Sequence, residues 1–176
     1  MRVVAGELRG RKLVAPPGDT TRPTADRVRE ALFSILGDVS DLRVLDLYAG
    51  SGALGIEALS RGAAAAVLVD SSRVAVTAIR RNLSELGLEA SVQRRDALAY
   101  LAAAGGGDPY DLVFVDPPYD SAVRLAPELA ELLPPVLAKD AVIVTESNKR
   151  APLELPFPLL RERSYGDTRI AVHRNG

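Results

Sequence analysis

The chain has no cysteine and no tryptophan, and a single histidine, His173, among its 176 residues. Without cysteine it has no disulfides and no thiolate sites, and one histidine argues against a zinc centre or a histidine-based catalytic site. No apolar run approaches the roughly 20 residues that a membrane-spanning helix requires. The first residues, Met1 to Glu7, lack the apolar core of a signal peptide. We therefore expect a metal-free cytoplasmic protein that does not enter a membrane.

The charged residues are unevenly distributed, although the formal net charge is only −1. Residues 1–29 hold seven basic and three acidic side chains, a local charge of +4. The remainder holds 15 basic and 20 acidic side chains, a charge of −5. A solvated surface explains any one of these basic residues, but as a cluster they indicate contact with a polyanion.

Strand and helix patterns alternate along most of the chain, whose length suits a single globular unit. We predict a basic arm and loop in residues 1–23, containing a β-hairpin of strands 3–5 and 12–15, and then one domain over residues 24–176. Helices are expected near 24–36, 53–61, 72–86, 96–104 and 121–133, and strands near 43–47, 66–70, 90–94, 112–115, 141–145, 159–165 and 168–174. This alternation predicts an α/β fold with a doubly wound, mainly parallel seven-stranded sheet and antiparallel strands at one edge.

The tetrapeptide Asp116-Pro117-Pro118-Tyr119 follows an apolar run, residues 112–115, that indicates a buried parallel strand. The two prolines end that strand, because neither can donate to a ladder and each fixes its own φ. A carboxylate and an aromatic ring are thereby held at the carboxyl end of a central strand, where open α/β sheets bind ligands. The simpler alternative is a polar turn with a tyrosine for packing.

A glycine-rich turn lies between the predicted strand 43–47 and the predicted helix 53–61. Its spacing, Gly50-x-Gly52-x-x-Gly55, also fits the dinucleotide fingerprint, so a nicotinamide-dependent oxidoreductase is an alternative. In that fingerprint, glycine follows the strand almost directly and seats a pyrophosphate at the helix N-terminus. Here Asp46 stands four residues before the first glycine. Its negative charge would repel a pyrophosphate but suits the ammonium and sulfonium groups of S-adenosylmethionine (SAM).

Three aspartates, Asp46, Asp70 and Asp96, lie at the ends of consecutive predicted strands, which line one crevice in a doubly wound sheet. Asp70 follows Gly50 by 20 residues, the distance at which an acid binds ribose hydroxyls. Asp96 suits either the adenine amine or the cap of the following helix. The expected cofactor-binding residues are Asp46, Tyr48, Ala49, Gly50, Ser51, Gly52, Asp70, Ser71, Asp96 and Ala97.

Together the two motifs resemble those of SAM-dependent amino methyltransferases of the Asp/Asn-Pro-Pro-Tyr type. The chain is more similar still to the bacterial 16S ribosomal RNA (guanine-N(2))-methyltransferase family, the guanine-966 enzymes. The resemblance covers nearly the whole chain and is carried by residues 4–6, 9–13, 21–30, 46–61 and 116–119. It implies the SAM-dependent methyltransferase fold, SAM as cofactor, and 16S ribosomal RNA in an assembling small subunit as the partner of a monomeric enzyme.

The resemblance also implies roles for the site residues. A guanine exocyclic amine is a weak nucleophile, because its lone pair is delocalised into the ring. Asp116 is expected to accept one amine hydrogen and the Pro117 carbonyl the other, while Pro118 stiffens the turn and Tyr119 stacks on the flipped base. RNA phosphates are expected to contact Arg9, Arg11, Lys12, Arg22 and Arg27.

Other functions remain open from the residues alone. They include the nicotinamide enzyme, a non-catalytic RNA-binding module with the same fold, and an amino methyltransferase acting on adenine, cytosine or protein glutamine. A sequence-specific DNA enzyme is disfavoured, because the chain has no separate target-recognition domain.

Overall fold

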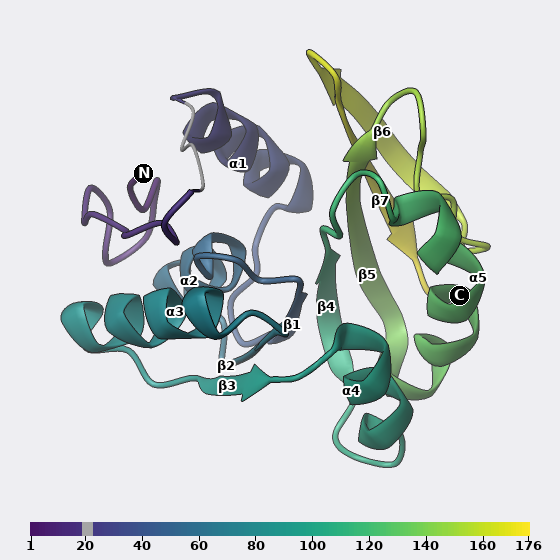
Figure 1. The fold of residues 1–176 in the computed structure, drawn as a ribbon, viewed down its shortest axis with the longest axis horizontal. Coiled ribbons are helices and arrows are strands. Elements are labelled where there is room, and N and C mark those ends of the chain that lie inside the picture. Colours follow the sequence, from purple (N-terminus) through teal and green to yellow (C-terminus); the bar gives the residue numbers. More distant parts are fainter. Residues whose placement is uncertain (19–22) are drawn as a thin grey trace.

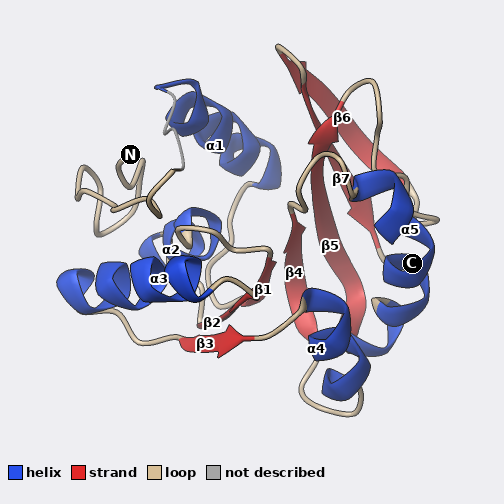
Figure 2. Ribbon diagram, in the orientation of Figure 1, coloured by secondary structure: helices blue, strands red, loops and turns tan. Residues whose placement is uncertain are grey.

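A seven-stranded sheet forms the centre of the protein, with helices on both of its faces (Figures 1 and 2). The computed structural model describes residues 1–18 and 23–176. The helices are α1 (Pro23–Leu36), α2 (Ala53–Ser60), α3 (Arg73–Leu86), α4 (Ala97–Ala104), α5 (Ala122–Leu132) and the 3₁₀ turn η1 (Pro134–Val136). The strands are β1 (Arg43–Leu47), β2 (Ala65–Asp70), β3 (Ser91–Arg94), β4 (Tyr110–Val115), β5 (Leu137–Asn148), β6 (Leu159–Tyr165) and β7 (Thr168–Arg174).

The strands follow the order β3-β2-β1-β4-β5-β7-β6. The first five are parallel to one another, and β7 runs antiparallel to both β5 and β6. The predicted doubly wound sheet with antiparallel strands at one edge is therefore confirmed. The strand order reverses at β1, which lies between β2 and β4. Such a switch point opens a crevice at the carboxyl ends of the strands, where α/β sheets bind ligands.

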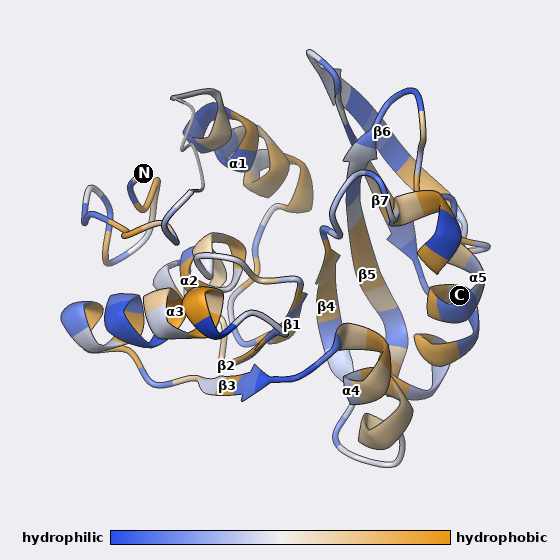
Figure 3. Cartoon of the chain, in the orientation of Figure 1, coloured by the Kyte–Doolittle hydropathy of each residue, from blue (hydrophilic) through white to orange (hydrophobic). Residues whose placement is uncertain are grey.

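The core has two layers because successive strand side chains point to opposite faces of the sheet. On one face, strand residues such as Val44 and Phe114 pack against α1, α2 and α3. On the other, residues such as Leu45 and Val113 pack against α4 and α5. Figure 3 shows apolar colouring along much of β4 and β5, which are covered on both sides. Within the described residues, no helix is both long and apolar enough to cross a bilayer.

The prediction of an N-terminal β-hairpin is wrong. Residues 1–18 contain one isolated antiparallel bridge, Arg2 with Lys12, with backbone hydrogen bonds from Val3 to Arg11 and from Leu13 to Met1 beside it, and otherwise form turns and irregular segments. The reason lies in where the backbone amides donate. The amides of Val4 and Ala5 bond to the Glu57 carboxylate of α2 instead of to a second strand. Contacts with a distant helix therefore keep this short pairing from extending into the two strands that the local pattern favoured.

The N-terminal segment, residues 1–18, is also tied into the core of the domain. Val3 and Leu13 are buried in the same layer as α1 and α2. The backbone N–H and carbonyl of Val14 both bond to the Asn82 side chain of α3, at 2.8 and 2.9 Å. The segment thus packs on α2 and α3, beside the face of the sheet that these helices cover (Figure 1).

Candidate functional site

An open groove of about 940 Å³ lies at the carboxyl ends of β1 and β4. This volume is at the upper end of the range for ligand pockets, large enough for a nucleoside cofactor beside a base. Its walls come from α1, the turn after β1, the turn after β4, the end of β5 and the β6–β7 turn. Eight predicted site residues line it: Arg27, Asp46, Tyr48, Ala49, Gly50, Ser51, Asp116 and Tyr119.

The turn after β1 brings its backbone to the groove through left-handed conformations. Gly50 has φ 59°, and a Cβ added there would meet no atom within 4 Å. Gly52 has φ 80°, but its added Cβ would lie 2.9 Å from Leu68 Cδ2. Gly50 therefore leaves space at the groove surface, whereas packing against the sheet requires the glycine at position 52.

Asp46 places a carboxylate at the groove although its exposed fraction is only 1%. Its Oδ2 accepts a hydrogen bond from the Gly55 amide at 2.9 Å. Burial raises the pKa of Asp46 to about 7, against the lowering effect of that hydrogen bond. The charge of Asp70 adds to the increase in pKa. A cationic ligand group in the groove would favour the ionised form of Asp46.

Four other expected cofactor residues lie at the carboxyl ends of β2 and β3 and do not line the groove. Asp70 ends β2 and accepts hydrogen bonds from the Gly50 amide at 2.9 Å and the Ser72 amide at 2.8 Å. Ser72, rather than Ser71, caps α3. Asp96 caps α4 by accepting from the Ala99 amide at 3.0 Å. Asp70 thus joins the glycine turn through Gly50, whereas Asp96, Ser71 and Ala97 lie further along the strand ends.

The turn after β4 presents Asp116 and Tyr119 to the groove. Pro117 is buried, and the carbonyl of exposed Pro118 accepts hydrogen bonds from the amide and hydroxyl of Ser121. These bonds close the turn at the start of α5. The Tyr119 hydroxyl lies 2.8 Å from Thr168 Oγ1, so the β6–β7 hairpin orients the ring.

The basic residues expected at RNA separate into two groups. Arg27 on α1 lines the groove, whereas Arg9, Arg11 and Lys12 are exposed on the N-terminal segment. The Arg11 guanidinium donates to the Glu85 carbonyl on α3 at 2.7 Å. Arg22 lies outside the described residues. The exposed basic residues of the N-terminal segment therefore do not line the groove, whereas Arg27 does.

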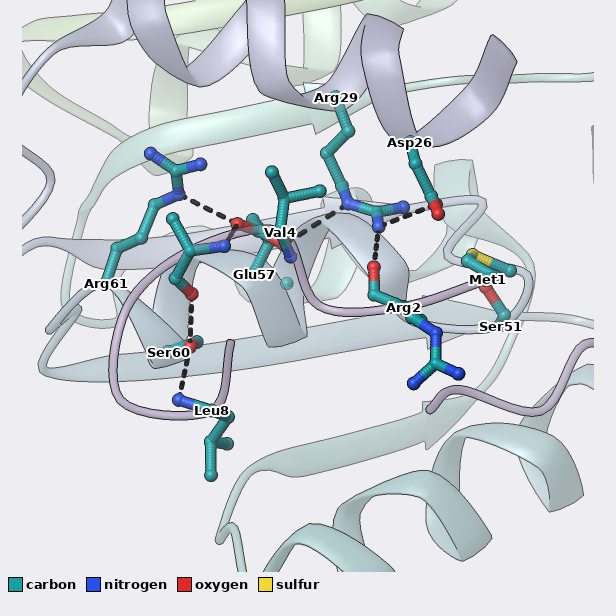
Figure 4. A network of polar contacts seen from close by, with 12 residues as sticks. Met1, Arg2, Val4, Leu8, Asp26, Arg29, Ser51, Glu57, Ser60 and Arg61 are labelled. Atoms are coloured by element: carbon teal, nitrogen blue, oxygen red, sulfur yellow. Dashed lines mark hydrogen bonds and ion pairs between the residues drawn. The ribbon is translucent and has the colours of Figure 1, made fainter. Parts of the chain in front are cut away.

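Sequence reasoning missed two acids, one that lines the groove and one that holds a residue of the groove wall. Glu146, near the end of β5, lines the groove beside Asp116, and its Oε1 accepts from the Tyr119 hydroxyl at 3.2 Å. Its signal was a carboxylate directly after a predicted strand, since Glu146 follows the strand predicted over residues 141–145. Glu57 on α2 forms an ion pair with Arg29 on α1, and Arg29 lines the groove (Figure 4). No local sequence pattern indicated the ion pair between Glu57 and Arg29.

SAM fits the residues present at this groove. The Asp46 carboxylate suits the ammonium group of SAM. The open space beside Gly50 lets the cofactor approach the backbone of the turn closely. Tyr48 also lines the groove, and its φ of 60° is a strained left-handed conformation for a residue other than glycine.

Comparisons with known proteins agree over nearly the whole chain. The family described as Conserved hypothetical protein 95 matches residues 1–174. The chain is 44% identical to ribosomal RNA small subunit methyltransferase D of Escherichia coli, covering 99% of this chain and 89% of that protein. The structure of the hypothetical protein TTHA0928 of Thermus thermophilus superposes with a TM-score of 0.85 at 31% identity, covering 99% of both chains.

A more distant solved structure shares the fold alone. The methyltransferase SMU.776, solved in complex with SAH, superposes with a TM-score of 0.72 at 16% identity and covers 88% of this chain and 50% of that one. The full-length matches are much closer. The chain thus belongs to the family of Conserved hypothetical protein 95, with the ribosomal RNA small subunit methyltransferases D among its relatives.

Proposed function

We propose that this protein is a SAM-dependent methyltransferase that methylates the exocyclic N2 amine of a guanine in 16S ribosomal RNA. The small-subunit methyltransferase relative at 44% identity supports the substrate, and the resemblance to the guanine-966 enzymes supports the N2 amine as the target. One observation carries the proposal for the site. The glycine turn after β1 and the Asp116 turn after β4 meet at one groove, because Leu47 and Val115 are paired neighbours in the sheet.

When bound, SAM supplies an electrophilic methyl group. In the proposed mechanism, Asp46 and the turn around Gly50 orient the cofactor. The Asp116 carboxylate accepts one hydrogen of the guanine amine and the Pro117 carbonyl accepts the other, which favours a more tetrahedral and more nucleophilic nitrogen. Asp116 then takes the proton released from that nitrogen or passes it to water. Holding the two reactants in line contributes much of the rate.

The base enters the groove after leaving its stack, and Tyr119 offers a ring for it to stack on. The hydroxyl of Tyr119 is held by Thr168, so the ring is already oriented before the base arrives. Asp70 is proposed to bind the ribose hydroxyls, and Asp96 the adenine amine in addition to its cap. Ser51, Gly52, Ser71 and Ala97 would shape the cofactor site around them.

We also propose that the substrate is 16S ribosomal RNA in an assembling small subunit, bound by a cytoplasmic monomer. Incubation with labelled SAM and small-subunit RNA, followed by nucleoside mass spectrometry, tests the function. Formation of N2-methylguanosine is expected. A labelled adenine, cytosine or protein product, or absorbance of a bound reduced nicotinamide, would refute it. Offering free 16S RNA and partly assembled subunits separately identifies the substrate state, and sedimentation identifies the oligomeric state.

A further inference from the structure

Glu146 stands beside Asp116 at the edge of the groove. Thr145 on β5 pairs with Val115 on β4, so Glu146 and Asp116 are the next residues of two adjacent parallel strands. Neighbouring strands lie about 4.8 Å apart, which lets two such side chains reach adjacent atoms of one ring. Both line the groove, together with the Tyr119 ring.

The surroundings of Glu146 leave its carboxylate with few partners. The Tyr119 hydroxyl donates to Oε1 at 3.2 Å. None of the ion pairs among the described residues includes Glu146. The adjoining recess is lined largely by apolar side chains, including those of Leu32 and Ile170. Burial accordingly raises the pKa of Glu146. A carboxylate so placed is stabilised by a ligand that brings hydrogen-bond donors.

We propose that Glu146 selects guanine by accepting a hydrogen bond from the ring N1–H, beside the amine that Asp116 holds. This inference rests on the proposed function. The Watson–Crick edge of guanine carries N1–H and the N2 amine as adjacent donors, which matches two adjacent carboxylates. At the same place adenine carries its N1 and cytosine its N3, and both atoms are acceptors. A carboxylate facing an acceptor is repulsive, so Glu146 would reject those bases as well as attract guanine.

The test uses 16S RNA with either guanine or 2-aminopurine at the methylated position, made by ligation and assembled with small-subunit proteins. 2-Aminopurine keeps the amine but has an acceptor at N1. The Glu146→Gln variant can donate to that acceptor through its amide. We expect its preference for guanine over 2-aminopurine, as the ratio of kcat/KM values, to fall by about 10- to 100-fold from that of the unaltered protein. The exposed Glu131→Gln on α5 is the matched control and should keep the preference.

SAM titration by calorimetry checks that the variants fold and bind cofactor. If Glu146→Gln does not fold or does not bind SAM, Glu146→Asp is tested in its place. Its shorter carboxylate should also reduce the preference for guanine over 2-aminopurine. An unchanged preference in a variant that binds SAM normally would overturn the inference. An unchanged preference is also the result expected if Glu146 were protonated and donated to guanine O6, because the glutamine amide would donate to O6 in the same way. If the unaltered protein forms no N2-methylguanosine at all, the proposed function fails and takes this inference with it.

Discussion

Arg29 and Glu57 form an ion pair almost completely withdrawn from water, with Nε 3.3 Å from Oε2 and exposed side-chain fractions of 4% and 0%. The Glu57 carboxylate also accepts hydrogen bonds from the amides of Val4 and Ala5 and pairs with Arg61 (Figure 4). One carboxylate thus joins α1, α2 and the N-terminal segment. Because Arg29 lines the groove, this network also fixes one of the groove's walls.

Replacing Glu57 by glutamine should therefore destabilise the protein strongly. The change leaves the buried Arg29 with only the partly exposed Asp26 as a counter-charge, and breaking a buried pair of this kind costs up to about 3–5 kcal/mol of unfolding free energy. Urea denaturation measures the difference. Glu85→Gln is the control, because its pair with Arg81 is 48% and 63% exposed and should contribute at most about 1 kcal/mol. Equal effects of the two substitutions would contradict this account.

Replacing Asp116 by alanine should slow methyl transfer by at least about 100-fold, since the amine loses a hydrogen-bond acceptor and a proton acceptor. Single-turnover methylation of small-subunit RNA measures the chemical step. SAM affinity should change little, because the proposed cofactor contacts come from the turn after β1 and from the carboxyl ends of β2 and β3. The exposed Asp120→Ala, four residues along the same loop, should behave like the unaltered protein. Near-normal turnover by Asp116→Ala would remove Asp116 from the mechanism.

Filling the space above Gly50 should weaken SAM binding. Asparagine tolerates the left-handed φ of 59° better than other side chains, so Gly50→Asn adds bulk at the groove with limited backbone strain. We expect a loss of affinity of at least about tenfold by calorimetry, equivalent to about 1.4 kcal/mol. Gly87→Asn is the matched control, at φ 67° with no atom near its added Cβ. Similar losses in both variants would indicate strain rather than contact with the cofactor.

The alternation of strands and helices was predictable because buried strands contain continuous apolar residues with glycine and polar residues between them. The predicted bounds 43–47, 159–165 and 168–174 match β1, β6 and β7. β5 is longer than predicted, from Leu137 to Asn148 instead of 141–145. Its carboxyl end is extended by pairing with β7, which begins 20 residues later in the chain. A strand's own residues do not reveal how far its partner extends.

Site residues were predictable where a reactive side chain stands at the end of a predicted strand. They were not predictable where their role depends on contacts between segments far apart in the sequence. Asp46 and Asp116 were found because each stands in or directly after an apolar run. Looking for a carboxylate directly after each predicted strand would also have found Glu146. The N-terminal hairpin was mispredicted because Glu57, more than 50 residues away, accepts the amides that a second strand would have bound. Such a contact leaves no periodic signal in either segment.

The exposed charges of the N-terminal segment should bind RNA phosphates. Changing Arg9, Arg11 and Lys12 together to glutamine should lower the salt slope of log K for RNA by roughly 2–3, since each neutralised phosphate contributes about 0.7–0.9. SAM affinity should not change. This charge-only variant is preferable to deleting residues 1–15, because deletion would also expose the core around Val3 and Leu13. Lys139→Gln, at the amino end of β5 and away from the groove, should leave the slope unaltered.

An unchanged RNA affinity and salt slope in the triple variant would show that the segment only packs against α2 and α3. A lowered slope with unchanged SAM binding would instead assign these residues to the substrate. The same titrations with Arg27→Gln examine the groove wall, where one lost phosphate contact should change the slope by about 0.7–0.9.

Asp46 should make both stability and cofactor binding depend on pH near neutrality. Its pKa rises from the ordinary 3.8 to about 7 on folding, chiefly through burial. Between these two values the folded state binds more protons than the unfolded state, so the unfolding free energy falls as pH increases from about 4 to about 7 and then levels off. Asp46→Asn cannot ionise and should lack this contribution. The difference between the two proteins in urea denaturation at each pH isolates it from other titrating groups, including His173, whose pKa is lowered by burial.

SAM affinity should change with pH in the opposite direction. The ammonium group of SAM needs the ionised carboxylate, so affinity should rise as pH increases through about 7, and SAM binding should release a proton when it starts below that pH. Calorimetry in buffers of different ionisation enthalpy measures the released proton directly. Asp46→Asn should bind SAM more weakly at pH 8, with a shallower dependence on pH. If both proteins show the same pH profile and the same proton release, the ammonium group does not lie at Asp46, and the cofactor must be oriented from another part of the groove.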